Sequence, residues 1–363
     1  MHIDVESHIS ERINPIILED LLRICKTDLP WGELDKKTVL IAGGGGFLAS
    51  YLAQSFLVLK RLYGLDIKVV CVVRNIETAR IRFQAWTGEK NFNILCHDIS
   101  KPFDENFPKA DLIIHCASQA SPKYYGTDPV GTLMANSIGT INLLEYASQS
   151  NAQKFMFLSS GEIYGAPLID EKLVSEIDYG YLDPMNVRSC YAESKRLGET
   201  MCVSWSHQFD LQTVVVRPFH TYGPGMSLND GRVFADFVAD VVAGRDIVLR
   251  SSGEAIRPFC YISDAIIGFL TALLRGESCE AYNVGNPFAE ISIKDLAMKL
   301  TKLFPDRGIG ITSDIRENAS YLQSPVLRSS PNIGKLHNLG WSPHIGIEEG
   351  FHRTILSFLQ SKS

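Results

Sequence analysis

The sequence predicts an α/β fold, a doubly wound parallel sheet followed by a smaller, loop-rich C-terminal region. Apolar runs of strand length, TVLIA, IKVVCVV, DLIIHCA, FMFLSS and TVVVRP, recur with room for a helix between them. Nearly continuous apolar strands that alternate with helices are typical of a parallel sheet covered on both faces. A glycine run stands directly after the first strand, in TVLIAGGGGFLAS, and supports the same fold.

The glycine run predicts a site for a dinucleotide. Gly43, Gly46 and Ala49 have G-x-x-G-x-x-A spacing between a strand and a helix, the context that such a motif needs. Glycine lets the backbone approach a pyrophosphate, and the first turn of the helix offers free N–H groups and a partial positive charge. We therefore expect Gly43, Gly46, Phe47 and Leu48 to contact the cofactor.

The ends of the next strands bear on the choice of cofactor. NAD-binding proteins commonly place an acid after the second strand to hold the ribose hydroxyls, but Val73 and Arg74 stand there. Arg74 could hold the 2′-phosphate of NADP, or it could flank the adenine of NAD. Asp98 and Ile99 follow a later strand and are expected near the adenine. We predict NAD, with NADP as the alternative.

Three regions are expected along the chain. Residues 1–36 form an N-terminal extension in which 11–29, ERINPIILEDLLRICKTDL, has the pattern of a short amphipathic helix. Residues 37–217 form a Rossmann-type dinucleotide-binding domain. In residues 218–363 the regular alternation of strands and helices is interrupted by stretches rich in Pro, Gly and polar residues, as in RPFHTYGPGMSLNDGR. They are expected to be mainly substrate-binding and partly interleaved with the first domain.

Composition and charge exclude several classes of protein. The chain has 363 residues and a net charge of −6, without the basic surplus of a nucleic-acid-binding protein. No apolar run reaches the ~20 residues that span a bilayer, and the start, MHIDVESHIS, is too polar for a secretory signal. Eight scattered cysteines without a C-x-x-C pair predict reduced thiols in a cytoplasmic protein, and no metal site.

The stretch SCYAESKRLGETM carries Tyr191 and Lys195 four residues apart, on one face of a helix. Alone, this pair fits an exposed polar face equally well. Together with a dinucleotide site, Y-x-x-x-K resembles the short-chain dehydrogenase/reductases, and the later landmarks resemble their extended branch, the nucleotide-sugar epimerases and dehydratases. Within that branch, HCASQASPKYYGTDPVGTL, RSCYAESKRLGETMC, NDGRV and YNVGNP are most similar to UDP-glucuronate decarboxylases.

The resemblance implies roles for the candidate catalytic residues. Tyr191 is the base, and Lys195 lowers its pKa and holds the nicotinamide ribose. Ser160 hydrogen-bonds the reacting hydroxyl, with the end of a strand capped as the alternative role. Glu162 faces the same site or bonds a loop backbone. Gly161 stands where the 4,6-dehydratases carry the aspartate that acts as general acid. Further cofactor contacts are expected from Ala117, Ser118 and Pro218.

The resemblance also implies a nucleoside diphosphate sugar as substrate, whose phosphates need cations. Arg232 and Arg257 are the main candidates, because a guanidinium grips phosphate or carboxylate through two hydrogen bonds. Arg188, Tyr125 and His220 are further candidates for contacts to the sugar or phosphates.

Several activities remain open at this point. An enzyme that oxidises the sugar at C4 and passes through a 4-keto intermediate could be a decarboxylase, a C4-epimerase or a 4,6-dehydratase. A dinucleotide-sensing regulator without catalysis is the remote alternative. The resemblance further implies a homodimer, paired through helices around residues 128–149 and 189–207.

Overall fold

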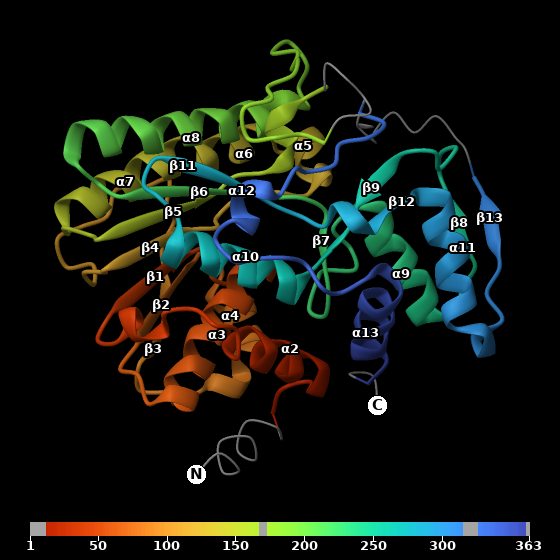
Figure 1. Cartoon of the computed structure of the whole chain (residues 1–363), viewed down its shortest axis with the longest axis horizontal. Coiled ribbons are helices and arrows are strands. Elements are labelled where there is room, and N and C mark those ends of the chain that lie inside the picture. The colour runs from red at the N-terminus through yellow and green to blue at the C-terminus, as the bar shows by residue number, and fades with distance from the viewer. Residues whose placement is uncertain (1–11, 167–172, 315–325, 361–363) are drawn as a thin grey trace.

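The computed structural model describes residues 12–166, 173–314 and 326–360. Its centre is a seven-stranded sheet with the order β11-β6-β5-β4-β1-β2-β3 (Figure 1), and all its neighbouring strands run parallel. The strands are β1 (Thr38–Ala42), β2 (Lys68–Val73), β3 (Phe92–Cys96), β4 (Leu112–His115), β5 (Lys154–Leu158), β6 (Thr213–Pro218) and β11 (Glu280–Val284). The predicted fold class is confirmed.

The order of the strands reverses beside β1, which lies between β2 and β4. In an open parallel sheet the crevice at such a reversal, outside the carboxyl ends of the strands, is where ligands bind. The glycine run follows β1, and the stretch Cys116–Ser118 follows β4. The fold therefore brings these two predicted cofactor segments to the same crevice.

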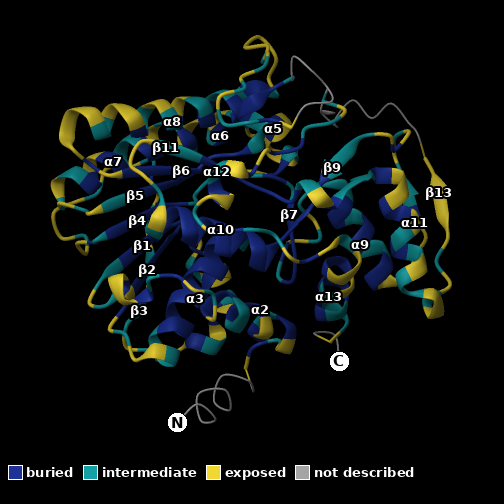
Figure 2. Cartoon of the chain, viewed as in Figure 1, coloured by how far each residue is buried: buried dark blue, intermediate teal, exposed yellow. Residues whose placement is uncertain are grey.

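Both faces of the sheet are buried along its inner strands, which are dark blue in Figure 2, whereas the edge strand β3 is partly exposed. Successive residues of a strand point to opposite faces, so Val39 and Ile41 of β1 join one apolar core while Leu40 and Ala42 join the other. The first core is covered by α3 (Phe47–Tyr63) and α10 (Ile262–Arg275), and the second by α7 (Ile138–Gln149) and α8 (Ser189–Phe209). This double cover explains why the strands are apolar throughout.

The smaller region lies to one side of the sheet (Figure 1). It contains short two-stranded pairings, β10 with β7, β12 with β9 and β13 with β8. Its elements are β7 (Thr221–Tyr222), α9 (Val233–Ala243), β8 (Ile247–Leu249), β9 (Ile256–Pro258), β10 (Cys260–Tyr261), β12 (Glu290–Ser292), α11 (Ile293–Leu303), β13 (Ile311–Ser313) and α13 (Ile347–Gln360). α10 and β11 come from the C-terminal half but belong to the large sheet layer. The domain boundaries themselves stay a prediction.

The remaining elements are short connectors. The helices are α4 (Ile76–Arg82), α5 (Pro122–Thr127), α6 (Pro129–Asn136) and α12 (Gly334–His337), and the 3₁₀ turns are η1 (Trp31–Leu34), η2 (Gln84–Trp86), η3 (Gly161–Tyr164), η4 (Pro287–Ala289) and η5 (Pro305–Arg307). Across the described ranges, no helix combines the length and apolar composition needed to cross a membrane.

The predicted N-terminal helix is present as α2 (Pro15–Cys25), shorter than the expected 11–29; residues 1–11 lie outside the described ranges. It begins at Pro15 because the Asn14 side chain accepts a hydrogen bond from the Ile16 N–H at 3.0 Å, an N-cap. Asp20 on its inner face is 1% exposed. The Asp20 carboxylate lies 2.9 Å from Arg353 Nη2 of α13 and accepts the Tyr261 hydroxyl at 2.8 Å.

Burial of Asp20 should make stability depend on pH. Burial raises the pKa of the Asp20 carboxyl from 3.8 to about 6, against the opposing effect of Arg353. A raised pKa in the folded state means that the stabilisation is complete below the unfolded value and is lost as pH rises through the folded value. The contribution of Asp20 to the free energy of unfolding should be smaller at pH 8 than at pH 5, by on the order of 1 kcal/mol.

Asp20→Asn removes this dependence. From pH 5 to pH 8 the wild type should therefore lose stability relative to the variant, by on the order of 1 kcal/mol of the free energy of unfolding. Urea unfolding at both pH values measures it. The same difference at both values would contradict the prediction.

Candidate active site

The turn after β1 requires glycine for a reason that the structure makes explicit. Gly43 has a φ of +77°, and a Cβ atom built on it would lie 2.6 Å from the Cα of Ala117 in the turn after β4. Gly46 is the N-cap of α3 without any side-chain cap, and its N–H donates to the Gly43 carbonyl at 2.8 Å. The first amides of α3, at Phe47 and Leu48, thus belong to an uncapped helix end, which fits the pyrophosphate of a dinucleotide.

A cavity of about 320 Å³ opens beside this turn. It brings together Phe47, Arg74 and Ser118, which were predicted for the cofactor, and Arg232, which was predicted for the substrate. The Ser118 hydroxyl is buried and has no hydrogen-bond partner among the described residues. The remaining lining residues are Gln119, Ala120, Ser121, Tyr124, Thr221, Met226, Ser227, Asp230 and Phe234. An uncapped helix end beside an unpaired buried hydroxyl fits a polar ligand such as NAD.

The residues predicted for the adenosine end lie in different environments. Arg74 is exposed after β2 and lines the cavity. The exposed Asp98 carboxylate accepts the Ser100 N–H at 3.0 Å and the Ser100 hydroxyl at 2.9 Å, and these bonds lower its pKa. Ile99 is 5% exposed, and a Cβ on Gly139 of α7 would come within 2.6 Å of its Cδ1. The structure therefore places the Ile99 side chain in the apolar core. Ala117 follows β4, and Pro218 ends β6.

Tyr191 and Lys195 are both buried on α8, at 6% and 1% exposure. The Lys195 ammonium donates to the Leu158 carbonyl at the end of β5, at 2.6 Å, and lies 5.9 Å from the centroid of the Tyr191 ring. Burial lowers the pKa of Lys195 to about 8. This burial is incompatible with the alternative of a solvated helix face.

The pKa of Tyr191 differs from the expectation. It is raised to about 12, first because the ring is buried and also because the Glu162 carboxylate is near, while a hydrogen bond from Ser160 and the charge of Arg232 act in the lowering direction. The expected lowering by Lys195 is not found, because the ammonium is directed at the Leu158 carbonyl. The protein by itself therefore holds Tyr191 as a neutral phenol.

The strand end after β5 places Ser160 and Glu162 next to Tyr191. Ser160 caps η3, because its hydroxyl accepts the Glu162 N–H at 3.1 Å, so both roles considered for Ser160 are compatible with its position. The Glu162 carboxylate forms an ion pair with Arg188 Nη1 at 2.9 Å. The Tyr125 ring stacks on that of Tyr191 with centroids 5.0 Å apart, and the Arg188 guanidinium lies 5.9 Å from the Tyr125 centroid. The predicted base and its predicted neighbours thus form one cluster.

The three remaining candidates lie on the smaller region's side of the cluster. Arg232 Nε lies 3.2 Å from the Asp230 carboxylate. Burial, with Arg257 and Arg232 nearby, holds the pKa of His220 well below its usual value, so this ring is neutral. The Arg257 guanidinium donates to the Val326 and Leu327 carbonyls, each at 2.9 Å, and so holds a backbone segment in this structure. Among the described residues, no three His, Cys, Asp or Glu side chains gather as a metal site.

Sequence reasoning missed a second layer of polar residues behind this cluster. Arg217 of β6 is 1% exposed and forms an ion pair with Glu199 of α8 at 2.6 Å. Ser159, the neighbour of Ser160, donates to the same carboxylate at 2.5 Å. The one available signal was the spacing of Glu199, four residues after Lys195.

Comparison with known proteins agrees with this site. The pattern described as "NAD dependent epimerase/dehydratase family" matches residues 39–285. UDP-glucuronic acid decarboxylase 1 of Xenopus tropicalis is 36% identical over 329 residues, 90% of this chain and 73% of that protein. UDP-glucuronic acid decarboxylase 6 of Arabidopsis thaliana is 33% identical over 315 residues, 86% of each chain. A crystal structure of UDP-glucuronic acid 4-epimerase from Bacillus cereus, in complex with UDP-glucuronic acid and NAD, has a TM-score of 0.76 at 22% identity, over 89% of this chain and 99% of that one.

The chain therefore belongs to the NAD dependent epimerase/dehydratase family. Within it, the two relatives named above by sequence are both UDP-glucuronic acid decarboxylases. The predicted membership of the extended branch is confirmed, and so is NAD as the family's cofactor. The likeness to the epimerase structure shows the shared fold.

Proposed function

We propose that this protein is an NAD-dependent enzyme that decarboxylates UDP-glucuronate through a 4-keto intermediate. The observation that carries the proposal is the cluster of Tyr191, Ser160 and the Glu162–Arg188 ion pair. Arg232 connects this cluster to the cavity at the uncapped end of α3, since it acts on Tyr191 and lines that cavity with Phe47. Two relatives at 33–36% identity over most of the chain, both UDP-glucuronic acid decarboxylases, support the choice of substrate.

The residues of the cluster have distinct tasks in this proposal. Tyr191 removes the proton of the sugar C4 hydroxyl, and Ser160 donates a hydrogen bond to the same oxygen. NAD, when bound, supplies the hydride acceptor and a positive charge that favours the Tyr191 phenolate. In the resulting ketone the C5 carboxylate is β to the carbonyl, so its C–C bond breaks, carbon dioxide leaves, and the electron pair moves to the C4 oxygen. Tyr191 and Ser160 stabilise that oxyanion, and Arg188 can pair with the substrate carboxylate beforehand.

Packing at Gly161 argues against the dehydratase alternative. A Cβ atom built on Gly161 would lie 2.9–3.1 Å from three carbons of the Phe219 ring. That ring is 4% exposed and stacks on Tyr164, so it cannot easily move away. The place where the dehydratases carry their acid is thus filled by Phe219.

Mass analysis of the products from a panel of nucleotide sugars tests the proposal. With UDP-glucuronate we expect a product that has lost carbon dioxide, because the carboxylate is β to the transient ketone. Loss of water, or an unchanged mass with altered retention, would instead indicate a dehydratase or an epimerase and overturn the proposal.

We expect the purified protein to release NAD, with Arg74 beside the adenosine. A contact between Arg74 and a 2′-phosphate would favour NADP by ~1.5–3 kcal/mol, roughly ten- to a hundredfold in affinity. An enzyme that returns its hydride within each turnover has no need to exchange its cofactor, and the family is NAD-dependent. Denaturing the protein and identifying the released nucleotide measures this, and recovery of mostly NADP would contradict it.

A homodimer through the stretches 128–149 and 189–207, which hold α6, α7 and α8, is part of the proposal. These helices pack together, and they expose apolar side chains at Val130, Leu133, Leu197 and Val203, each at least 40% exposed. Light scattering at micromolar concentration should give the dimer mass, and Leu197→Glu should give the monomer because it places a charge in the interface. Ile81→Glu, at a 71% exposed position on α4, is the matched control and should remain dimeric. A monomeric wild type would contradict the prediction.

The cysteines support a cytoplasmic location, which stays a proposal. All eight are free thiols: four are buried, two are partly buried, and two, Cys96 and Cys279, are exposed. Free thiols are typical of proteins in a reducing compartment. Cell fractionation with an antibody to the chain would test the location.

A further inference from the structure

Tyr191, Lys195 and Glu199 form a ladder on α8 with four-residue spacing, so the three side chains share one helix face. Two consecutive serines after β5 meet this ladder. Ser160 hydrogen-bonds Tyr191, and Ser159 donates to the Glu199 carboxylate at 2.5 Å. The strand end and the helix are therefore joined at both ends of the ladder.

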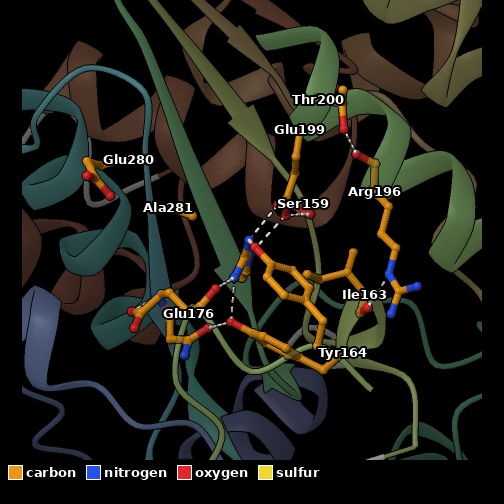
Figure 3. A network of polar contacts seen from close by, with 12 residues as sticks. Ser159, Ile163, Tyr164, Glu176, Arg196, Glu199, Thr200, Glu280 and Ala281 are labelled. Atoms are coloured by element: carbon orange, nitrogen blue, oxygen red, sulfur yellow. Dashed lines mark hydrogen bonds and ion pairs between the residues drawn. The ribbon is translucent and has the colours of Figure 1, made fainter. Parts of the chain in front are cut away.

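Glu199 is held in place from the other side by Arg217. Arg217 Nε lies 2.9 Å from one carboxylate oxygen and Nη2 lies 2.6 Å from the other, a bidentate pair. The same guanidinium donates to the Tyr164 hydroxyl and to the Glu176 carbonyl, each at 2.8 Å. Figure 3 shows Glu199, Ser159 and Tyr164 converging on this point. The carboxylate is thus held by Arg217 of β6 and Ser159 at the end of β5, and Tyr164 of η3 holds the Arg217 guanidinium in turn.

Glu199 also acts on Lys195 through its charge. Burial disfavours the Lys195 ammonium, while Cys116, Glu199 and Cys202, in that order, favour it. The titratable groups facing this pair are His115 and Cys116 at the end of β4, Tyr191 and Cys202 of α8, Tyr164 of η3 and Arg217 of β6. The two thiols have raised pKa values because they are buried, and His115 is held neutral because it is buried beside Lys195. Glu199 is therefore the carboxylate that offsets the desolvation of Lys195.

We propose that Glu199, clamped by Arg217 and Ser159, is a positioning residue that keeps Lys195 charged and holds the Tyr191 helix in register with Ser160. The inference rests on the proposed function for its catalytic meaning, because Lys195 is expected to hold the nicotinamide ribose, and a charged ammonium is the stronger hydrogen-bond donor for it. The charge state of the buried Lys195 can be measured whichever reaction the protein catalyses.

The test is Glu199→Gln, which keeps the size and the hydrogen bond from Ser159 but removes the charge and with it the ion pair to Arg217. Lysines labelled with ¹³C at Cε are titrated by NMR in the full-length protein, with the Lys195 resonance assigned by Lys195→Arg. We expect the Lys195 midpoint to fall by about one pH unit, because a favourable nearby charge is lost. The alkaline limb of kcat/KM against pH, which reports the required acid in the free enzyme, should fall by the same amount.

Glu193→Gln is the matched control. It removes the same charge from the same helix, but its ion pair is with Arg196 at 3.6 Å, and we expect neither midpoint to move. Glu199→Asp keeps the charge and should keep the midpoint. Lowered activity of Glu199→Gln with both midpoints unchanged would overturn the proposal and leave Glu199 a structural residue.

Two other outcomes also decide the matter. If the wild type converts no nucleotide sugar, the proposed function fails, and the NMR titration still supports or overturns the role of Glu199. If Glu199→Gln does not fold, the wild-type titration decides, because a Lys195 midpoint well below neutral pH would show that Glu199 does not keep the ammonium charged.

Discussion

Replacing Tyr191 with phenylalanine is expected to lower turnover by ~10²–10⁴-fold, the usual contribution of a positioned acid or base. The variant loses the hydroxyl that meets Ser160, while its ring keeps the stacking on Tyr125 at 5.0 Å. The fold and the release of NAD on denaturation should therefore be unchanged. Steady-state turnover of UDP-glucuronate, with circular dichroism of the purified variant, measures both.

The raised pKa of Tyr191 sharpens this prediction. Because burial raises the pKa of the Tyr191 phenol, the rate of the wild type should rise with pH until the phenol is ionised or another group limits the rate. Phenylalanine cannot titrate, so the residual rate of the variant should lack this rise. Tyr63→Phe is the matched control, since its hydroxyl bonds the Cys25 carbonyl, away from the site. A folded Tyr191→Phe protein with wild-type turnover would exclude Tyr191 as the base.

The sequence was sufficient for the parts of the molecule that follow local rules. Apolar runs predicted the strands, because a strand buried on both faces must be apolar throughout. The glycine run predicted the turn after β1, because the φ of +77° at Gly43 excludes most other residues. The four-residue spacing predicted that Tyr191 and Lys195 share a helix face, and both are buried at the expected place.

The sequence was insufficient where the outcome depends on distant segments. The Arg257 guanidinium donates to the carbonyls of residues 326 and 327. The motif around Arg257 does not predict this contact with a segment about 70 residues away in the chain. The direction of the Tyr191 pKa depends on burial and on where the Lys195 ammonium points. Arg217 and Glu199 are charged residues on different elements, and their type alone predicts exposure. Arg217 and Glu199 pair because β6 and α8 pack against each other in the folded protein.

Arg217→Met is expected to cost ~3–5 kcal/mol of the free energy of unfolding, the usual effect of removing one partner of a buried ion pair. The side chain is 1% exposed, and its loss leaves the Glu199 carboxylate, 13% exposed, without its cation. Tyr164, Tyr179 and the Glu176 carbonyl lose a donor as well. Urea unfolding of wild type and variant at one protein concentration measures the loss.

Two further variants separate the ion pair from other effects. Arg245→Met removes the same kind of side chain from a surface ion pair with Asp240, where the arginine is 64% exposed, and should cost no more than ~1 kcal/mol. Arg217→Lys keeps the charge but loses the planar fork that binds both carboxylate oxygens. Its loss of free energy of unfolding should therefore lie between those of Arg217→Met and Arg245→Met. An Arg217→Met protein as stable as Arg245→Met would contradict the prediction, because a buried carboxylate left without its cation must either lose stability or take up a proton.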